Sequence, residues 1–134
     1  MLKEIGVWIC TQVPGLTRGA NLQVGYRDQK APVRCHTILE SGGQVPDFEL
    51  PDRIDYLLQV ASRAETYQAA REDAWAMFNA LHGTAGWRIA AIVSGGPAYI
   101  AQVIEALAAP QYLGQDEKGA FEFSTNYTFR MIRA

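Results

Sequence analysis

The stretch GAFEFSTNYTFRM, residues 119–131, determines the class of fold. From residue 121 onward its side chains alternate strictly, as in a strand whose two faces have different surroundings. One face would carry Phe121, Phe123, Thr125, Tyr127, Phe129 and Met131, and the other Glu122, Ser124, Asn126, Thr128 and Arg130. We therefore expect a long strand with one face packed and the other toward solvent or a partner.

The residues before this strand predict a helix, a hairpin and a loop. Apolar side chains recur at three- and four-residue steps over residues 66–82, which predicts an amphipathic helix that Gly83 is suited to end. Residues 87–93 and 99–107 alternate as strands, and the Ser-Gly-Gly-Pro sequence between them is a hairpin signature. Residues 111–118 are polar and predict a loop.

The N-terminal half predicts one more helix and three more strands. Residues 2–13 have helical spacing, although Gly6 costs about 1 kcal/mol relative to alanine. The three alternating segments are residues 22–27, 33–40 and 53–63. The order α-β-β-β-α-β-β-β predicts an α+β fold, with an antiparallel-dominated (mixed) β-sheet and two main helices on its apolar side.

A loop interrupts this pattern at residues 41–51. It holds Gly42, Gly43, Pro46 and Pro51, which disfavour both helix and strand. Loops of this length are uncommon in small domains and are often functional. We expect a flexible, exposed arm.

Composition limits the class of protein. The chain has 134 residues, enough for one domain over residues 1–134, and its net charge of −2 disfavours a dedicated nucleic-acid-binding protein. No apolar run approaches the roughly 20 residues of a spanning helix, and residues 5–10 are too short for a signal peptide. We expect no membrane partner and a reducing, intracellular compartment in which Cys10 and Cys35 stay unpaired.

Candidate catalytic groups are few. Cys35 and His36 are neighbours on a predicted strand, so their side chains point to opposite faces and cannot share a proton. His82 lies at a helix C-terminus, where a positive charge is stabilising, and Ser94-Gly95-Gly96 lacks the ending of a phosphate-binding loop. The sequence predicts no catalytic residue, no cofactor and no metal site, hence not an enzyme.

One sheet face is left without a predicted cover. Within residues 99–107, Tyr99 and Val103 alternate with Ile100 and Ile104. Both faces of that predicted strand therefore carry apolar side chains. The basic residues are nine arginines and three lysines, and arginine suits forked interface contacts. Both features favour a protein that assembles with copies of itself.

A family resemblance runs nearly from end to end of the chain and rests on short stretches in a common order. These are Gly6-Val7-Trp8, residues 12–16, Gly19 with Asn21-Leu22, Pro51-Asp52-Arg53, Ser62-Arg63-Ala64 with Thr66-Tyr67, Ala74-Trp75, and residues 78–83, 109–112, 114–119 and 121–127. With them the chain resembles the tail terminators, a group of minor capsid or tail-completion proteins of long-tailed bacteriophages or their prophages.

The resemblance implies a structural role in the virion. Similar proteins form a ring, usually a hexamer, that ends tail-tube elongation and provides the surface for head-tail joining. The partners so implied are other copies of the chain, the tail tube protein and the head connector or stopper protein. DNA passes through the lumen without sequence-specific binding, which a mildly acidic chain would favour. The implied location is the head-proximal end of the virion tail, after assembly in the host bacterial cytoplasm.

Two groups of residues are candidates for these contacts. Candidate subunit-interface residues, in a turn and at a strand start, are Arg27, Asp28, Lys30, Arg53 and Asp55. Candidate tube or connector contacts lie in the arm (Gln44, Asp47, Phe48, Glu49) and in the second polar loop (Gln115, Asp116, Glu117, Lys118).

Two alternatives remain open from the sequence. One is another head-tail connector component, such as a head-completion or stopper protein. The other is a small soluble enzyme or ligand-binding module, which would show a deep pocket with converging polar groups.

Overall fold

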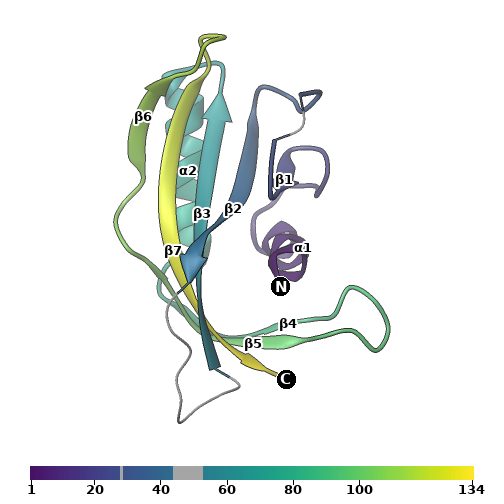
Figure 1. The fold of residues 1–134 in the computed structure, drawn as a ribbon. Helices are drawn as coiled ribbons and strands as arrows, with labels where there is room; N and C mark the ends of the chain where they lie inside the picture. Colours follow the sequence, from purple (N-terminus) through teal and green to yellow (C-terminus); the bar gives the residue numbers. More distant parts are fainter. Residues whose placement is uncertain (28, 44–52) are drawn as a thin grey trace.

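In the described residues the fold is a single seven-stranded sheet with two helices. The structure, a computed structural model, describes residues 1–27, 29–43 and 53–134 (Figure 1). Its elements are α1 (Leu2–Gln12), β1 (Leu22–Val24), β2 (Cys35–Gly43), β3 (Arg53–Ala64), α2 (Tyr67–Leu81), β4 (Thr84–Ile89), β5 (Tyr99–Ala106), β6 (Gln111–Gln115) and β7 (Phe121–Arg133). The predicted α+β class and element order are confirmed, with β6 as an added strand.

The strand order is β1-β2-β3-β7-β5-β4, and β6 also pairs with β7. Every pairing is antiparallel except that of β1 with β2, so the sheet is mixed as expected. The longest ladder joins β3 and β7 from Arg53↔Ile132 to Ala64↔Phe121 without a register shift. Alternation along residues 121–131 therefore identified the longest strand of the sheet.

Both helices pack on one face of this sheet (Figure 1). Ile5 and Ile9 of α1 and Leu81 of α2 belong to one buried cluster with Leu58 of β3 and Phe129 of β7. The register sets Tyr56 opposite Phe129 and Leu58 opposite Tyr127, so these strand residues share the helix-covered face. The predicted apolar face of residues 121–131 is the face that the helices cover.

The helix ends follow local rules. Thr66 is the N-cap of α2, and its hydroxyl accepts the Ala69 N–H at 3.2 Å. After α2, Gly83 has φ +77°, a conformation that side-chain-bearing residues rarely adopt. The helix predicted over residues 66–82 is confirmed to within one residue at each end.

Gly6 lies where α1 comes close to the sheet. A Cβ atom added there would stand 2.8 Å from Cγ2 of Val24 and 3.3 Å from Cδ1 of Ile38. The glycine that weakens the helix is therefore the residue that allows α1 to approach β1 and β2.

Several predicted boundaries are wrong. Residues 41–43 extend β2, and the rest of the predicted arm, residues 44–51, lies outside the described residues. Residues 25–27 do not continue β1, since Gly25 has φ +86° and turns the chain. The hairpin strand predicted at 87–93 begins earlier, as β4, and ends at Ile89, so the apolar residues 90–93 lie in its loop.

Two further corrections concern β5 and β6. The polar loop predicted at 111–118 is a strand over its first five residues, because its backbone pairs with β7 while most of its side chains stay exposed. In β5 a register irregularity between Ala101 and Val103 moves Val103 to the face opposite Tyr99. Tyr99 and Val103 therefore do not share a face.

Candidate functional site

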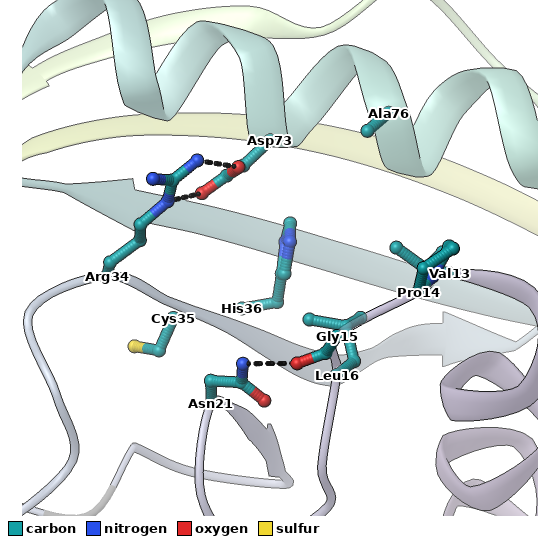
Figure 2. A pocket seen from close by; sticks show the side chains of 10 residues that line it. All are labelled: Val13, Pro14, Gly15, Leu16, Asn21, Arg34, Cys35, His36, Asp73 and Ala76. Carbon is teal, nitrogen blue, oxygen red and sulfur yellow. Dashed lines mark hydrogen bonds and ion pairs between the residues drawn. The ribbon is translucent and has the colours of Figure 1, made fainter.

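The first cavity lies between the end of α1, the start of β2 and α2. It has a volume of about 260 Å³ and is lined by Val13, Pro14, Gly15, Leu16, Asn21, Arg34, Cys35, His36, Asp73 and Ala76 (Figure 2). At its rim the Arg34 guanidinium donates two hydrogen bonds to Asp73, at 2.8 Å from Nε and 2.7 Å from Nη2. Asn21 donates to the Gly15 carbonyl at 2.8 Å, which closes the turn after α1.

His36 is the buried polar group of this cavity. Its Nδ1 lies 2.8 Å from Ser62 Oγ, and burial lowers the pKa of His36 to about 4. The Asp73 carboxylate, which would be the third member of a catalytic triad, is instead held by Arg34. Ser62 is buried and is not among the residues that line the cavity. The geometry gives His36 a structural role in joining β2 to β3.

Cys35 and His36 point to opposite sides of β2, as the alternation predicts (Figure 2). Cys35 is buried, and burial raises the pKa of its thiol. Cys10 is half-buried, and both cysteines are free thiols. A reactive cysteine needs an exposed, easily ionised thiol, which neither residue has.

A second cavity, which we call the arginine cleft, lies at the end of the sheet where β3 terminates and β6 turns into β7. Its volume is about 250 Å³, and its lining residues are Arg27, Gln29, Arg63, Asp116, Glu117 and Lys118. The cleft combines residues from both predicted contact groups, since Arg27 was an interface candidate and residues 116–118 were tube or connector candidates.

Arg63 forms the wall of this cleft. Its side chain is only 9% exposed, and its Nη2 donates to Asp116 Oδ2 at 2.8 Å. The other Asp116 oxygen, Oδ1, accepts the backbone N–H groups of Lys118 and Ala120, each at 2.9 Å. The Ala120 N–H, aided by that of Lys118 and by the Arg63 charge, lowers the pKa of Asp116.

Arg27 reaches the same region from the segment after β1. Its Nη1 donates to Glu122 Oε1 at 2.9 Å, so the segment is fixed to the start of β7. Lys30 also lies in this segment and is exposed, whereas Asp28 lies outside the described residues. Gln115 is the last residue of β6, and its side-chain amide donates to the Gly119 carbonyl at 3.2 Å.

The other interface candidates lie at the opposite end of the sheet. Arg53 and Asp55 are in the first three residues of β3, with Nε and Oδ1 3.7 Å apart. The structure therefore separates this pair from Arg27 by the length of β3. The arm candidates Gln44, Asp47, Phe48 and Glu49 lie outside the described residues.

The sequence did not single out Arg63, the most buried basic side chain of the cleft. Arg63 stands within the alternating stretch that predicts β3. A charged residue in such a stretch indicates only that its side chain points away from the helix-covered face. Its partner Asp116 is distant in the sequence, and the turn that brings them together depends on the unpredicted β6. A buried charge of this kind is informative only once its burial is known.

The sheet face opposite the helices is only partly covered. The register places on this face Leu57 of β3, Asn126 and Ile132 of β7, and Ile100 and Val103 of β5. Asn126 is exposed, and the four apolar residues are all partly exposed. Apolar side chains are therefore distributed over an accessible sheet face.

Comparison with known proteins identifies the family. A family model described as bacteriophage tail terminator protein matches residues 26–131. This range includes β2 and β3, and it includes every predicted contact residue that the structure describes. No curated protein matches the chain. Within the described residues, neither helix is long and apolar enough to cross a membrane. The chain thus belongs to the bacteriophage tail terminator family.

Proposed function

We propose that copies of this chain form a hexameric ring. This ring caps the phage tail tube and ends its elongation. The ring would then provide the surface to which the head connector or stopper protein joins. As a member of its family the chain is a structural tail protein. The family match over residues 26–131 is the observation that carries the proposal.

Two features of the fold support a ring. One sheet face has partly exposed apolar residues and, within the part of the chain that the structure describes, no helix over it, which suits burial against a neighbour. The outer strands β4 and β6 leave backbone groups available at the sheet edge. A head-to-tail contact between unlike surfaces closes into a ring when the rotation allows.

We also propose which residues make the contacts of this ring. Arg27, Asp28, Lys30, Arg53 and Asp55 are proposed for the subunit interface. Gln44, Asp47, Phe48 and Glu49, together with Gln115, Asp116, Glu117 and Lys118, are proposed for contacts with the tail tube or the connector. DNA would pass through the lumen, and the ring would occupy the head-proximal end of the virion tail after assembly in the host cytoplasm.

The decisive experiment is in vitro assembly of the phage's own tail tube protein with and without this protein. We expect tubes of uncontrolled length without it and capped tubes with it, measured by electron microscopy. The mass by light scattering and six-fold averages of negatively stained particles test the ring. Tubes that grow equally in its presence, together with binding to the head connector alone, would instead identify a stopper protein.

A further inference from the structure

We propose that the cavity between α1, β2 and α2 binds an uncharged carbonyl group, such as that of an amide or a ketone, carried on a short branched apolar chain. The buried His36 side chain donates a hydrogen bond to this group. The inference goes beyond the proposed function and does not depend on the formation of a ring.

The first observation is a ring nitrogen without a partner. His36 is only 4% exposed, and its Nδ1 lies 2.8 Å from Ser62 Oγ. The other ring nitrogen, Nε2, has no hydrogen-bond partner among the described residues. His36 lines the cavity and Ser62 does not, so the edge of the ring that faces away from Ser62 borders the cavity (Figure 2). Nε2 belongs to this edge.

The Ser62 hydroxyl determines which ring nitrogen carries the proton. Its one hydrogen-bond partner among the described residues is His36 Nδ1. A proton on Nδ1 would be donated to Oγ and would leave the buried hydroxyl proton without an acceptor, which is costly. The favoured arrangement has Ser62 donating to Nδ1 and the ring proton on Nε2. Burial lowers the pKa of His36 to about 4, so the ring is neutral at pH 7 and Nε2–H is a donor toward the cavity.

The other polar groups around the cavity already have partners. Asn21 donates to the Gly15 carbonyl at 2.8 Å, and its Oδ1 accepts the Thr17 N–H at 2.6 Å. Arg34 and Asp73 form a forked ion pair at the rim, so their charges cancel. The imidazole Nε2–H is therefore the donor for which a ligand would supply the acceptor.

The walls and charges of the cavity select the class of ligand. Val13, Pro14, Leu16 and Ala76 give it an apolar lining, which suits a branched aliphatic chain. Its volume of about 260 Å³ lies below the range of about 300–1,000 Å³ that is usual for drug-sized ligands, so the ligand is small. A carboxylate would share the cavity with the Asp73 carboxylate, and a cation would face the Nε2–H donor. An uncharged acceptor satisfies the imidazole without either cost.

Four small compounds of similar shape test this chemistry: isobutyramide, methyl isopropyl ketone, isobutyrate and isobutylamine. In NMR spectra of the protein with nitrogen-15-labelled histidine, the amide and the ketone should shift the His36 Nε2 resonance saturably at pH 7.0. We expect dissociation constants in the millimolar range for both. Isobutyrate and isobutylamine should bind at least tenfold more weakly. His82, the other histidine of the chain, is the internal control and should not respond.

A leucine substitution tests the position of the site. Ala76 is an exposed residue of α2 that lines the cavity, so Ala76→Leu would occupy part of the space and should weaken isobutyramide binding at least tenfold. Ala108→Leu makes the same change at an exposed position outside the cavity lining and should alter binding less than twofold. Circular dichroism checks that both variants fold.

A carbonyl group of this kind can come from a free compound or from a neighbouring protein chain. Saturation-transfer NMR with isobutyramide, on the single chain and on the protein assembled on tail tubes, separates the two sources. Equal binding supports a free compound as the ligand. Binding that weakens at least tenfold on assembly supports a carbonyl group that a neighbouring chain supplies.

The proposal is overturned if isobutyrate or isobutylamine binds as tightly as isobutyramide, or if Ala76→Leu binds the amide as the unchanged protein does. Spectra that place the imidazole proton on Nδ1 also overturn it. The absence of a saturable shift with any of the four compounds would mean that water alone fills the cavity, which refutes the site.

Discussion

His36 Nδ1 and Ser62 Oγ face each other across β2 and β3 at 2.8 Å, at directly opposed positions of the antiparallel ladder. The pair lies on the helix-covered face, beneath α2, and both residues are buried. The strands are therefore joined by a side-chain hydrogen bond in addition to their backbone ladder. Since the imidazole must stay neutral there, its protonation opposes folding.

The protein should lose stability as the pH falls from about 6.5 toward 4. Burial lowers the pKa of His36 from 6.5 to about 4, so in this window the unfolded chain takes up a proton that the folded chain does not. A shift of this size corresponds to about 3 kcal/mol, which is fully present above pH 6.5 and lost progressively below it. Urea unfolding at pH 7.0 and 4.5 measures the change. His36→Gln should flatten this dependence, whereas His82→Gln should leave it; equal slopes for His36→Gln and the unchanged protein would refute the assignment.

Removing the N-cap of α2 should destabilise the protein measurably. Thr66→Ala deletes the hydroxyl that accepts the Ala69 N–H, which costs about 1 kcal/mol at typical caps. The midpoint of urea unfolding should fall accordingly. Thr66→Ser keeps the acceptor and serves as the control; a loss as large as that of the alanine variant would mean that the hydrogen bond is not the cause.

Gly6→Ala should destabilise the fold although alanine is the better helix former. Its Cβ would lie 2.8 Å from the stiff, branched side chain of Val24, and overpacking typically costs 1–3 kcal/mol against a propensity gain of about 1 kcal/mol. We expect a net loss of about 1 kcal/mol in thermal or urea unfolding. Adding Val24→Ala should relieve the contact, so Gly6→Ala should cost less in that background. A stabilised single variant would show that α1 can move away freely.

The Arg34–Asp73 ion pair should contribute little to stability despite its forked geometry. The Arg34 side chain is 61% exposed, and solvent-exposed pairs are typically worth less than 1 kcal/mol. Arg34→Ala should therefore lower the free energy of unfolding by under 1 kcal/mol, and 1 M salt should remove most of the difference. A loss of several kcal/mol that persists in salt would mean that the pair supports the cavity beneath it.

The parts of the fold that could be predicted have local causes. Alternation over residues 121–131 identified both the strand and its buried face, because one side contacts the helices along its whole length. Thr66 caps the start of α2 and Gly83 follows its end. Both effects depend only on residues within one turn of the helix ends. These signals need no knowledge of the rest of the chain.

The parts that could not be predicted depend on pairing across the sheet. β6 is a strand because its backbone bonds to β7, while the sequence QYLGQ is polar and has no regular alternation. The register irregularity in β5 likewise reassigns Val103 to the other face. The arginine cleft depends on both the β6–β7 turn and the burial of Arg63, so only its rim residues could be named in advance.

The uninterrupted β3–β7 ladder makes the molecule a spacer of fixed length. The start of β3 lies at one end of this ladder and the arginine cleft at the other, and β3 has no bulge between them. If neighbouring copies join through these two ends, the circumference of their assembly is set by the rise of a β-strand. Inserting two residues into each strand would preserve both faces, since the side-chain period is two, and would lengthen every subunit by about 7 Å. The bore of the closed particle would then widen by an amount that microscopy can measure.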